Sequence, residues 1–225
     1  MIDNRPRGGR RAQAAANDET ILLAAREVFL ANPSAPIAAV AQRAGVGISA
    51  LYRRYPSKQE LVATLCAISQ QIYLAEVERA LAQDSDPWDA WVQWLRRIVD
   101  ADTHALVVRL AGTFTPTPAH LERAERIRVL GNRLFSRTKA ARAFRPGLTF
   151  LDVNLLLEMV STTRLGDAAR SAEMRRRYLD VVITGMSSGS AERLAGRPPS
   201  WQEESARWLT SDSYASRGVV SATVP

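Results

Sequence analysis

Residues 36–61 have the sequence PIAAVAQRAGVGISALYRRYPSKQEL, in which two short helical patterns flank a pair of glycines. Apolar side chains in residues 37–44 recur at the 3, 4 and 7 spacing of one helix face. Gly45 follows, and glycine readily takes the left-handed conformation that ends a helix. A second amphipathic run covers residues 48–55 and stops at Pro56. The stretch therefore predicts a helix, a tight turn and a second helix.

The second of these helices has two unlike faces. Ile48, Leu51 and Tyr55 fall on one side at about 100° per residue, with Tyr52 at the border. The other side carries small residues and paired arginines, namely Ser49, Ala50, Arg53 and Arg54. A helix that presents such a face suits entry into the major groove of DNA. The spacing alone also fits an ordinary pair of helices with a solvated basic face.

Residues 41–61 follow the pattern A-x-x-A-G-V-G-I-S-A-L-Y-R-R-Y-P-S-K-x-x-L, which resembles the DNA-binding signature of TetR-family transcriptional regulators. The resemblance implies that residues 45–55 form the turn and the recognition helix. The chain departs from the family pattern at Pro36 and Ala50, where threonine is usual, so hydroxyl contacts at these positions are in doubt. The G-V-G-I-x-x-L-Y-R variant and the D-P-W sequence of residues 86–88 resemble the SbtR-like branch.

Nine side chains in and around the two helices are candidates for contact with DNA. Arginine bound to guanine is the commonest specific pairing, so Arg53 is the leading candidate for reading a base. The rings of Tyr52 and Tyr55 are expected to pack inward while their hydroxyl groups reach phosphates. Lys58 lies at the start of the next helix, where backbone N–H groups also attract phosphate. The predicted set is Gln42, Arg43, Ser49, Ala50, Tyr52, Arg53, Arg54, Tyr55 and Lys58.

The composition favours helices and excludes several classes of protein. The chain has 225 residues, 46% of them hydrophobic, which is enough for a substantial core. Alanine, leucine and arginine dominate, and alternating strand-like runs are absent. There is no apolar run near the ~20 residues of a membrane span, and no apolar region of a signal peptide. The single cysteine, Cys66, fits a reducing compartment. We therefore expect an all-α cytoplasmic protein.

The net charge of +7 is concentrated toward the N-terminus. Residues 1–60 contain nine basic and five acidic side chains, whereas residues 61–225 contain 21 and 18. A basic region attracts a polyanion by steering and counterion release, which supports binding to DNA. Charge alone would fit RNA or a membrane surface equally well.

We divide the chain into four parts. Residues 1–16 form a basic flexible arm, which either lies along DNA or is a solvated tail. Residues 17–56 form a three-helix helix-turn-helix DNA-binding domain, in which Asn17 caps the first helix. Residues 57–186 form a helical ligand-binding and dimerisation domain, and residues 187–225 form a mostly flexible tail. The expected helices of the second domain cover residues 57–84, a segment from Pro87, and residues 104–112, 118–144, 152–165 and 170–186.

Apolar side chains of the second domain are candidates for a ligand pocket or a core. Three tryptophans occur within seven residues, and they either line an aromatic pocket or fill the interior of the domain. The predicted pocket lining is Tyr73, Trp88, Trp91, Trp94, Phe114, Phe135 and Met159. In the TetR family the last two long helices pair with those of a second subunit. The residues this implies at a dimer interface are Leu155, Leu156, Met159, Tyr178, Leu179, Val182 and Ile183, unless they are buried within one subunit.

These observations favour a homodimeric repressor that binds a palindromic operator in double-stranded DNA and responds to a small molecule. A DNA-binding activator or a ligand-independent regulator is the alternative, and an all-α enzyme or carrier is a more distant one. No phosphate loop, nucleophile elbow or paired metal ligands occur in the sequence. The only histidines, His104 and His120, have no second ligand at metal-binding spacing. We expect no metal, no cofactor and no catalytic residues.

Overall fold

The computed structural model describes residues 7–110, 112–189 and 192–206, and its regular structure is helical. The helices are α1 (Arg7–Ala31), α2 (Ile37–Ala44), α3 (Ile48–Arg54), α4 (Lys58–Ala82), α5 (Pro87–Ala101), α6 (Thr103–Leu110), α7 (Pro118–Ala140), α8 (Phe150–Ser161), α9 (Ala168–Met186) and α10 (Trp201–Ala206). Within these ranges one isolated β-bridge, between Phe144 and Ser187, is the only extended pairing. The all-α prediction is confirmed.

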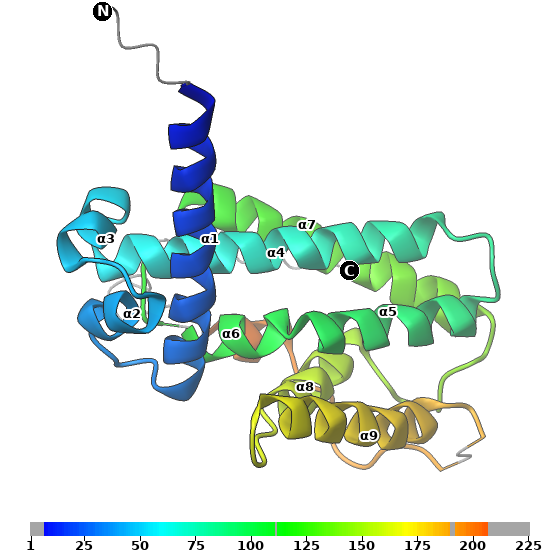
Figure 1. The fold of residues 1–225 in the computed structure, drawn as a ribbon. Coiled ribbons are helices and arrows are strands. Elements are labelled where there is room, and N and C mark those ends of the chain that lie inside the picture. The colour runs from blue at the N-terminus through cyan, green and yellow to red at the C-terminus, as the bar shows by residue number, and fades with distance from the viewer. Residues whose placement is uncertain (1–6, 111, 190–191, 207–225) are drawn as a thin grey trace, which may run out of the picture.

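Helix α4 is the long axis around which the other helices are arranged (Figure 1). Helices α1, α2 and α3 gather at its N-terminal end, where α1 crosses it steeply. Helices α5, α6 and α7 pack along α4, and α8 and α9 form a further layer against α5. The molecule thus has a small N-terminal head, made of α1 to α3, and a larger helical body, and α4 passes from one to the other.

The two hydrophobic cores are joined through α4 and α6. The first turns of α4 contribute Leu61 and Leu65 to the core of the head, whereas Tyr73 and Val77 belong to the core of the body. Helix α6, which follows α5 in the body, also packs its apolar residues into the head core. A displacement of α4 or α6 would therefore also displace the helix-turn-helix, because close-packed interiors transmit strain.

A cluster of charges forms a second link between head and body. Asp102 ends α5 in the left-handed conformation, with φ of 51°. Its Oδ2 atom lies 3.4 Å from Nη2 of Arg26 in α1 and 3.6 Å from Nη2 of Arg175 in α9. Nη2 of Arg164 is 4.0 Å from Oδ1, and Arg26 also donates a 2.8 Å hydrogen bond to the carbonyl oxygen of Ala101. One carboxylate thus connects α1 to α9.

The helix starts agree with the expected segments in α4 and α5 but not with the predicted cap in α1. Ser57 accepts a hydrogen bond from the backbone N–H of Glu60, and Asp86 caps α5 ahead of Pro87. Helix α1 begins at Arg7, so the predicted cap at Asn17 is wrong. The sequence RRAQAAA before Asn17 consists of strong helix formers, which continue the helix. Residues 1–6 of the predicted arm lie outside the described part.

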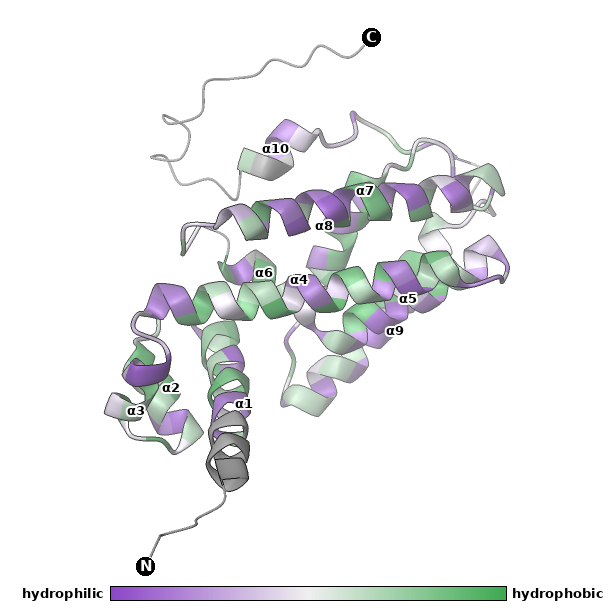
Figure 2. Ribbon diagram, turned by 90° about the horizontal axis from the view of Figure 1, so that it is seen from above, coloured by the Kyte–Doolittle hydropathy of each residue, from purple (hydrophilic) through white to green (hydrophobic). Residues whose placement is uncertain are grey.

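The end of α7 and part of the predicted tail also differ from expectation. Helix α7 ends at Ala140, because Phe144 leaves the helical register to pair with Ser187 and to pack in the core. Beyond α9, Arg145 donates a 2.7 Å hydrogen bond to the carbonyl oxygen of Glu192, and Arg128 lies over the ring of Trp201. Helix α10 therefore lies beside α7 (Figure 2). The remainder of the predicted tail, residues 207–225, lies outside the described ranges.

Candidate nucleic-acid interface

The turn between α2 and α3 has the predicted geometry. Gly45 has φ of 67°, and Val46 donates a 3.1 Å hydrogen bond back to the carbonyl oxygen of Ala41. Gly47 then precedes α3 in an extended conformation. A side chain at position 45 would be strained, because L-residues rarely adopt this φ. The turn thus sets the direction of α3 relative to α2.

Helix α3 is anchored by the second half of its apolar face. Leu51 and Tyr55 are buried in the head core. Ile48, which was expected beside them, is 40% exposed. Ile48 is the first residue of α3, and only the later apolar residues of this face belong to the head core. Because α3 is anchored through Leu51 and Tyr55, the face of the helix opposite these residues remains exposed.

The outward face of α3 carries the residues that the sequence assigns to DNA. Ser49, Tyr52 and Arg53 are exposed, and Ala50 is half-buried. Arg53 forms no hydrogen bond or ion pair with any residue in the described ranges. Gln42, late in α2, is exposed as well. This face offers one uncommitted guanidinium group, an amide and two hydroxyl groups, which are donors suited to base edges and phosphates.

Arg54 and Tyr55 are engaged within the protein. Nε and Nη2 of Arg54 each donate a 2.8 Å hydrogen bond to the carboxylate of Asp18 in α1. The hydroxyl group of Tyr55 donates a 2.6 Å hydrogen bond to Oδ1 of the same carboxylate. The hydrogen bonds from Arg54 lower the pKa of Asp18, whereas burial and then the bond to Asp18 raise the pKa of Tyr55. The hydroxyl group of Tyr55, which was expected to reach a phosphate, is bound to Asp18 in this conformation.

No residue pattern in the sequence indicates that Asp18 is part of this site. Its only local signal is that of an acidic residue directly after the predicted cap Asn17, where it would suit the helix dipole. Because α1 begins at Arg7, Asp18 lies in the middle of the helix and faces α3. It attaches the end of the recognition helix to α1.

Two further predicted contacts also have intramolecular partners. Nη2 of Arg43 lies 2.6 Å from Oε2 of Glu27 in α1, but both side chains are more than half exposed, and such pairs contribute little. Nζ of Lys58 donates a 2.9 Å hydrogen bond to the carbonyl oxygen of Pro33 and lies 5.2 Å from the centre of the Phe29 ring. Lys58 thereby holds the loop between α1 and α2 against α4.

Most of the residues predicted for a ligand pocket pack in the hydrophobic cores. Trp91 and Trp94 are fully buried and lie 4.9 Å apart between ring centres, with the ring of Phe135 at 5.8 Å from that of Trp91. Tyr73 and Trp88 pack at the same aromatic core. Phe114 belongs to the head core instead. The second interpretation of the tryptophans, as core residues, therefore describes their packing.

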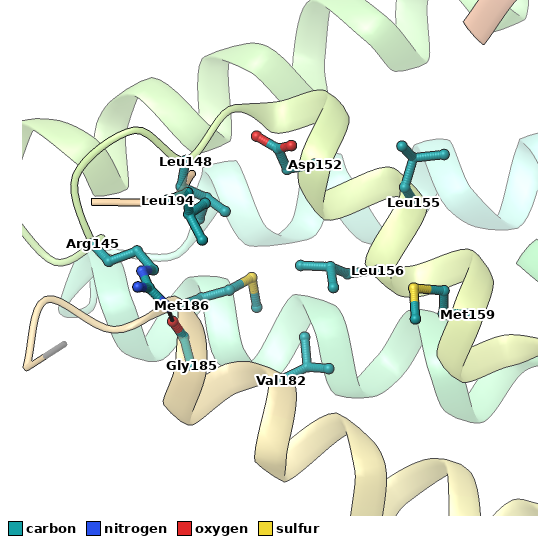
Figure 3. A pocket seen from close by; sticks show the side chains of 10 residues that line it. All are labelled: Arg145, Leu148, Asp152, Leu155, Leu156, Met159, Val182, Gly185, Met186 and Leu194. Carbon is teal, nitrogen blue, oxygen red and sulfur yellow. Dashed lines mark hydrogen bonds between the residues drawn. The ribbon is translucent and has the colours of Figure 1, made fainter. Parts of the chain in front are cut away.

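Met159 lines a cavity of about 360 Å³ between α8 and α9 (Figure 3). The lining residues are Arg145, Leu148, Asp152, Leu155, Leu156, Met159, Val182, Gly185, Met186 and Leu194. Six of these residues were in none of the predicted sites, because they come from a loop, from helix ends and from the segment after α9, namely Arg145, Leu148, Asp152, Gly185, Met186 and Leu194. No short-range pattern relates such positions.

The residues predicted for a dimer interface divide into three groups. Leu179 and Ile183 are buried in the core of their own chain, so intrachain burial accounts for these two. Met159 and Tyr178 are 68% and 45% exposed. Leu155, Leu156 and Val182 are half-buried and lie at the cavity. Val181, which was not predicted, is 67% exposed on α9. An apolar surface thus remains on the outer sides of α8 and α9.

His120 connects two helices of the protein. Its ring lies 2.6 Å from the hydroxyl oxygen of Thr117 and 2.9 Å from the carbonyl oxygen of Ala63, which ties the start of α7 to α4. No group of three potential metal ligands is found among the described residues. None of the helices in the same ranges has the length and apolar character needed to cross a membrane.

The helix-turn-helix head and the separate helical body define a class of protein, the two-domain transcriptional regulators that bind DNA. A profile described as bacterial regulatory proteins, tetR family, matches residues 21–65, and one described as transcriptional regulator SbtR-like, C-terminal domain, matches residues 86–188. The chain belongs to the TetR family and has an SbtR-like C-terminal domain, as its sequence pattern indicated. Regulators of this family are transcription factors rather than enzymes, which excludes the enzyme alternative.

Solved structures of similar fold are regulators of the same family. LfrR from Mycobacterium smegmatis, in complex with proflavine, superposes with a TM-score of 0.58 and 22% identity over 80% of this chain and 99% of LfrR. SCO0520 from Streptomyces coelicolor superposes with a TM-score of 0.51 and 24% identity, over 75% of this chain and 97% of SCO0520. CprB from S. coelicolor A3(2) superposes with a TM-score of 0.55 and 16% identity, over 86% of this chain and 94% of CprB. A search of curated proteins finds no match.

Proposed function

We propose that this protein is a homodimeric repressor that binds a palindromic operator through α3 and releases it when a small molecule binds the helical body. The observation that carries the proposal is the outward face of α3, on which Arg53 is exposed and uncommitted beside Tyr52 and Ser49. A recognition helix that is packed on one side and free on the other suits the major groove.

Dimer formation is supported by the apolar surface of α8 and α9. Met159, Tyr178 and Val181 leave large apolar groups in water, and exposed apolar patches mark interaction sites. A symmetric pair of chains would bury this surface against its own copy. Two recognition helices could then read two half-sites, which gives a short helix useful affinity.

The response to a ligand is supported by the shared packing of head and body. Helices α4 and α6 contribute to the head core, and Asp102 links α1 to α9. A ligand that favours one arrangement of the body would therefore also favour one orientation of α3. The complex of LfrR with proflavine is an example of small-molecule binding in this fold. An activator or a ligand-independent regulator remains the alternative, and titration of the DNA complex with effectors separates these possibilities.

The test is binding of the purified protein to the DNA that flanks its own gene, with scrambled DNA as the competitor and a series of salt concentrations. Arg53→Ala is expected to lose sequence preference by about 1–3 kcal/mol, because a base contact is removed. Arg54→Ala is the matched variant one residue away, and it should retain sequence preference because Arg54 is held by Asp18. Equal binding of both DNAs would reject the flanking site as the operator. Absence of binding at low salt would reject the repressor itself.

The dimer is tested separately by sedimentation equilibrium. Val181→Glu places a charge on the exposed apolar surface without touching the core. It should shift the protein toward monomer and weaken operator binding, while Glu192→Gln, on the segment after α9, should change neither. A monomeric wild-type protein that still binds the operator tightly would rule out the homodimer.

A further inference from the structure

The cavity between α8 and α9 runs from an apolar end at Met159 to a charged end at Arg145 (Figure 3). Met159 is 68% exposed, so solvent reaches the apolar end. Leu156 and Val182 line the middle, and Leu148 and Met186, which are 5% and 2% exposed, lie near Arg145 at the other end. At about 360 Å³, the cavity falls in the range of sites for small organic molecules.

Arg145 brings a positive charge to one end of the cavity, and no ion pair compensates it among the described residues. Its Nη1 and Nη2 atoms donate to the carbonyl oxygens of Gly185, at 3.3 Å, and Glu192, at 2.7 Å. Its Nε atom is buried and has no hydrogen-bond partner in the described structure. A guanidinium group has five N–H donors, and two carbonyl acceptors leave the others unused. Arg145 is half-buried, and a buried N–H donor without an acceptor is costly, so an anion at this place would be favoured.

Asp152, the other charged residue of the cavity, does not neutralise Arg145. Its carboxylate accepts hydrogen bonds from the backbone N–H of Thr149, at 2.8 Å, and from the hydroxyl group of the same residue, at 2.6 Å. It therefore serves the N-terminal cap of α8, and no ion pair joins it to Arg145 among the described residues. The carboxylate is committed to the helix end, whereas the guanidinium group is available.

The segment after α9 borders the charged end. Leu194 lines the cavity, and Glu192 accepts the hydrogen bond from Arg145 through its carbonyl oxygen. A second chain that packs on the outer side of α8 and α9 would approach the exposed Met159 end. The charged end beneath residues 192–194 suits a molecule small enough to enter between the helices.

We propose that this cavity is the effector site and that it binds a single-chain aliphatic carboxylate, with the carboxylate on Arg145 and the chain extending past Leu156 and Val182 toward Met159. The inference rests on the proposed ligand-responsive function, because binding here would change the packing of α8 against α9. The site adjoins the core around Trp91 and Trp94, because Leu148 and Met186 belong to that core and also line the cavity. The two tryptophans themselves are fully buried and do not line it.

The methionines provide a direct test in the full-length protein. Met159 and Met186 line the cavity, whereas Met174 is buried elsewhere in α9. NMR of ¹³C-methyl methionine during titration with decanoate should shift the Met159 and Met186 signals and leave Met174 unchanged. Titration calorimetry should show one site per chain, with decanoate binding at least tenfold more tightly than 1-decanol or decylamine. Octanoate should bind roughly tenfold more weakly than decanoate, because two methylene groups are lost.

Arg145→Gln should weaken decanoate binding at least tenfold, and Arg145→Lys should restore part of it. Arg193→Gln is the matched control, since it removes a nearby exposed charge that does not line the cavity. Equal binding by Arg145→Gln and the wild type would overturn the proposal. So would binding that is lost in Trp94→Phe but kept in Arg145→Gln, or signal shifts that follow only the monomer–dimer equilibrium.

Operator binding is measured in the same samples, which separates this inference from the proposed function. Methionine shifts without release of DNA would support the site and reject the ligand-responsive repressor. Specific operator binding without methionine shifts would reject the site and leave the regulator intact. Shifts accompanied by release of DNA would support both.

Discussion

Asp18 and Arg54 form a two-bond pair that joins α1 to the end of the recognition helix, with both N–O distances at 2.8 Å. The hydroxyl group of Tyr55 donates to the same carboxylate. The pair divides the two adjacent arginines of α3 between two roles, because Arg54 is held by the protein and Arg53 is not. A sequence in which both arginines look equivalent thus yields one structural and one available guanidinium group.

Replacing Asp18 by asparagine should strengthen binding to DNA of any sequence. The substitution removes a negative charge near α3 and releases Arg54, which can then approach a phosphate. The slope of log K against log salt should become steeper by about 0.9, the value for one additional phosphate contact. Glu19→Gln is the control, since it removes the same charge from the neighbouring position of α1 without releasing an arginine. An unchanged slope in Asp18→Asn would contradict this role for the pair.

The stabilising effect of Asp18 should depend on pH in the acid range. Its pKa is lowered in the folded protein, mainly by the hydrogen bonds from Arg54. The contribution is therefore fully present above the unfolded value of about 3.9, and is lost as the pH falls through the lower folded pKa. Urea unfolding at pH 7 should show Asp18→Asn less stable by up to about 1 kcal/mol, since Arg54 is largely exposed. The difference should shrink as the pH is lowered below about 3.9, and a difference that stays constant there would exclude titration of Asp18 as the cause.

Asp102→Asn should destabilise the protein far more than Asp100→Asn, two residues away. Asparagine tolerates the left-handed conformation of residue 102. The substitution therefore removes only the negative charge that interacts with Arg26, Arg164 and Arg175. Because Arg175 is 8% exposed, we expect a cost near 3 kcal/mol, the lower end for a broken buried pair. Asp100 pairs with Arg176 at the surface, so its loss should cost less than about 1 kcal/mol. Denaturant unfolding of the two variants measures both values, and equal costs would contradict a special role for Asp102.

Gly131→Ala should destabilise the body of the protein. A Cβ atom at position 131 in α7 would lie 2.2 Å from Cζ of Phe150, which is buried in the core. Overpacking of this kind typically costs about 1–3 kcal/mol. Gly185→Ala is the matched helical control, since nothing lies within 4 Å of its Cβ, and alanine should stabilise the helix by up to about 1 kcal/mol. Thermal unfolding should therefore shift in opposite directions, and a stabilising Gly131→Ala would show that Phe150 can move aside.

The helix-turn-helix could be predicted because its signals are local. The spacing of apolar residues defines α2, Gly45 takes the positive φ of the turn, and Ser57 caps α4 through a bond three residues away. Asp86 and Pro87 mark the start of α5 in the same way. The exception is α1, for which the predicted start at Asn17 is wrong. The strong helix formers before Asn17 are themselves helical, and a residue that is suited to capping does not interrupt them.

The roles of individual side chains at the site could not be predicted in the same way. Asp18 is separated from Arg54 by 36 residues, and Arg26 from Asp102 by 76. The tryptophans of α5 have the same spacing whether they line a pocket or fill a core. Only the positions of α4, α7 and α8 around them determine which of these occurs.

The sequence by itself determined the family, the all-α fold and the place of the recognition helix, because these depend on the residue types within one or two helical turns. The tertiary structure decided which charged groups of that region are available, since a guanidinium group is free or committed according to carboxylates brought from distant helices. It also decided where space remains in the body, because the cavity between α8 and α9 depends on how two helices, the loop before α8 and the segment after α9 pack together, and no local residue pattern encodes that packing.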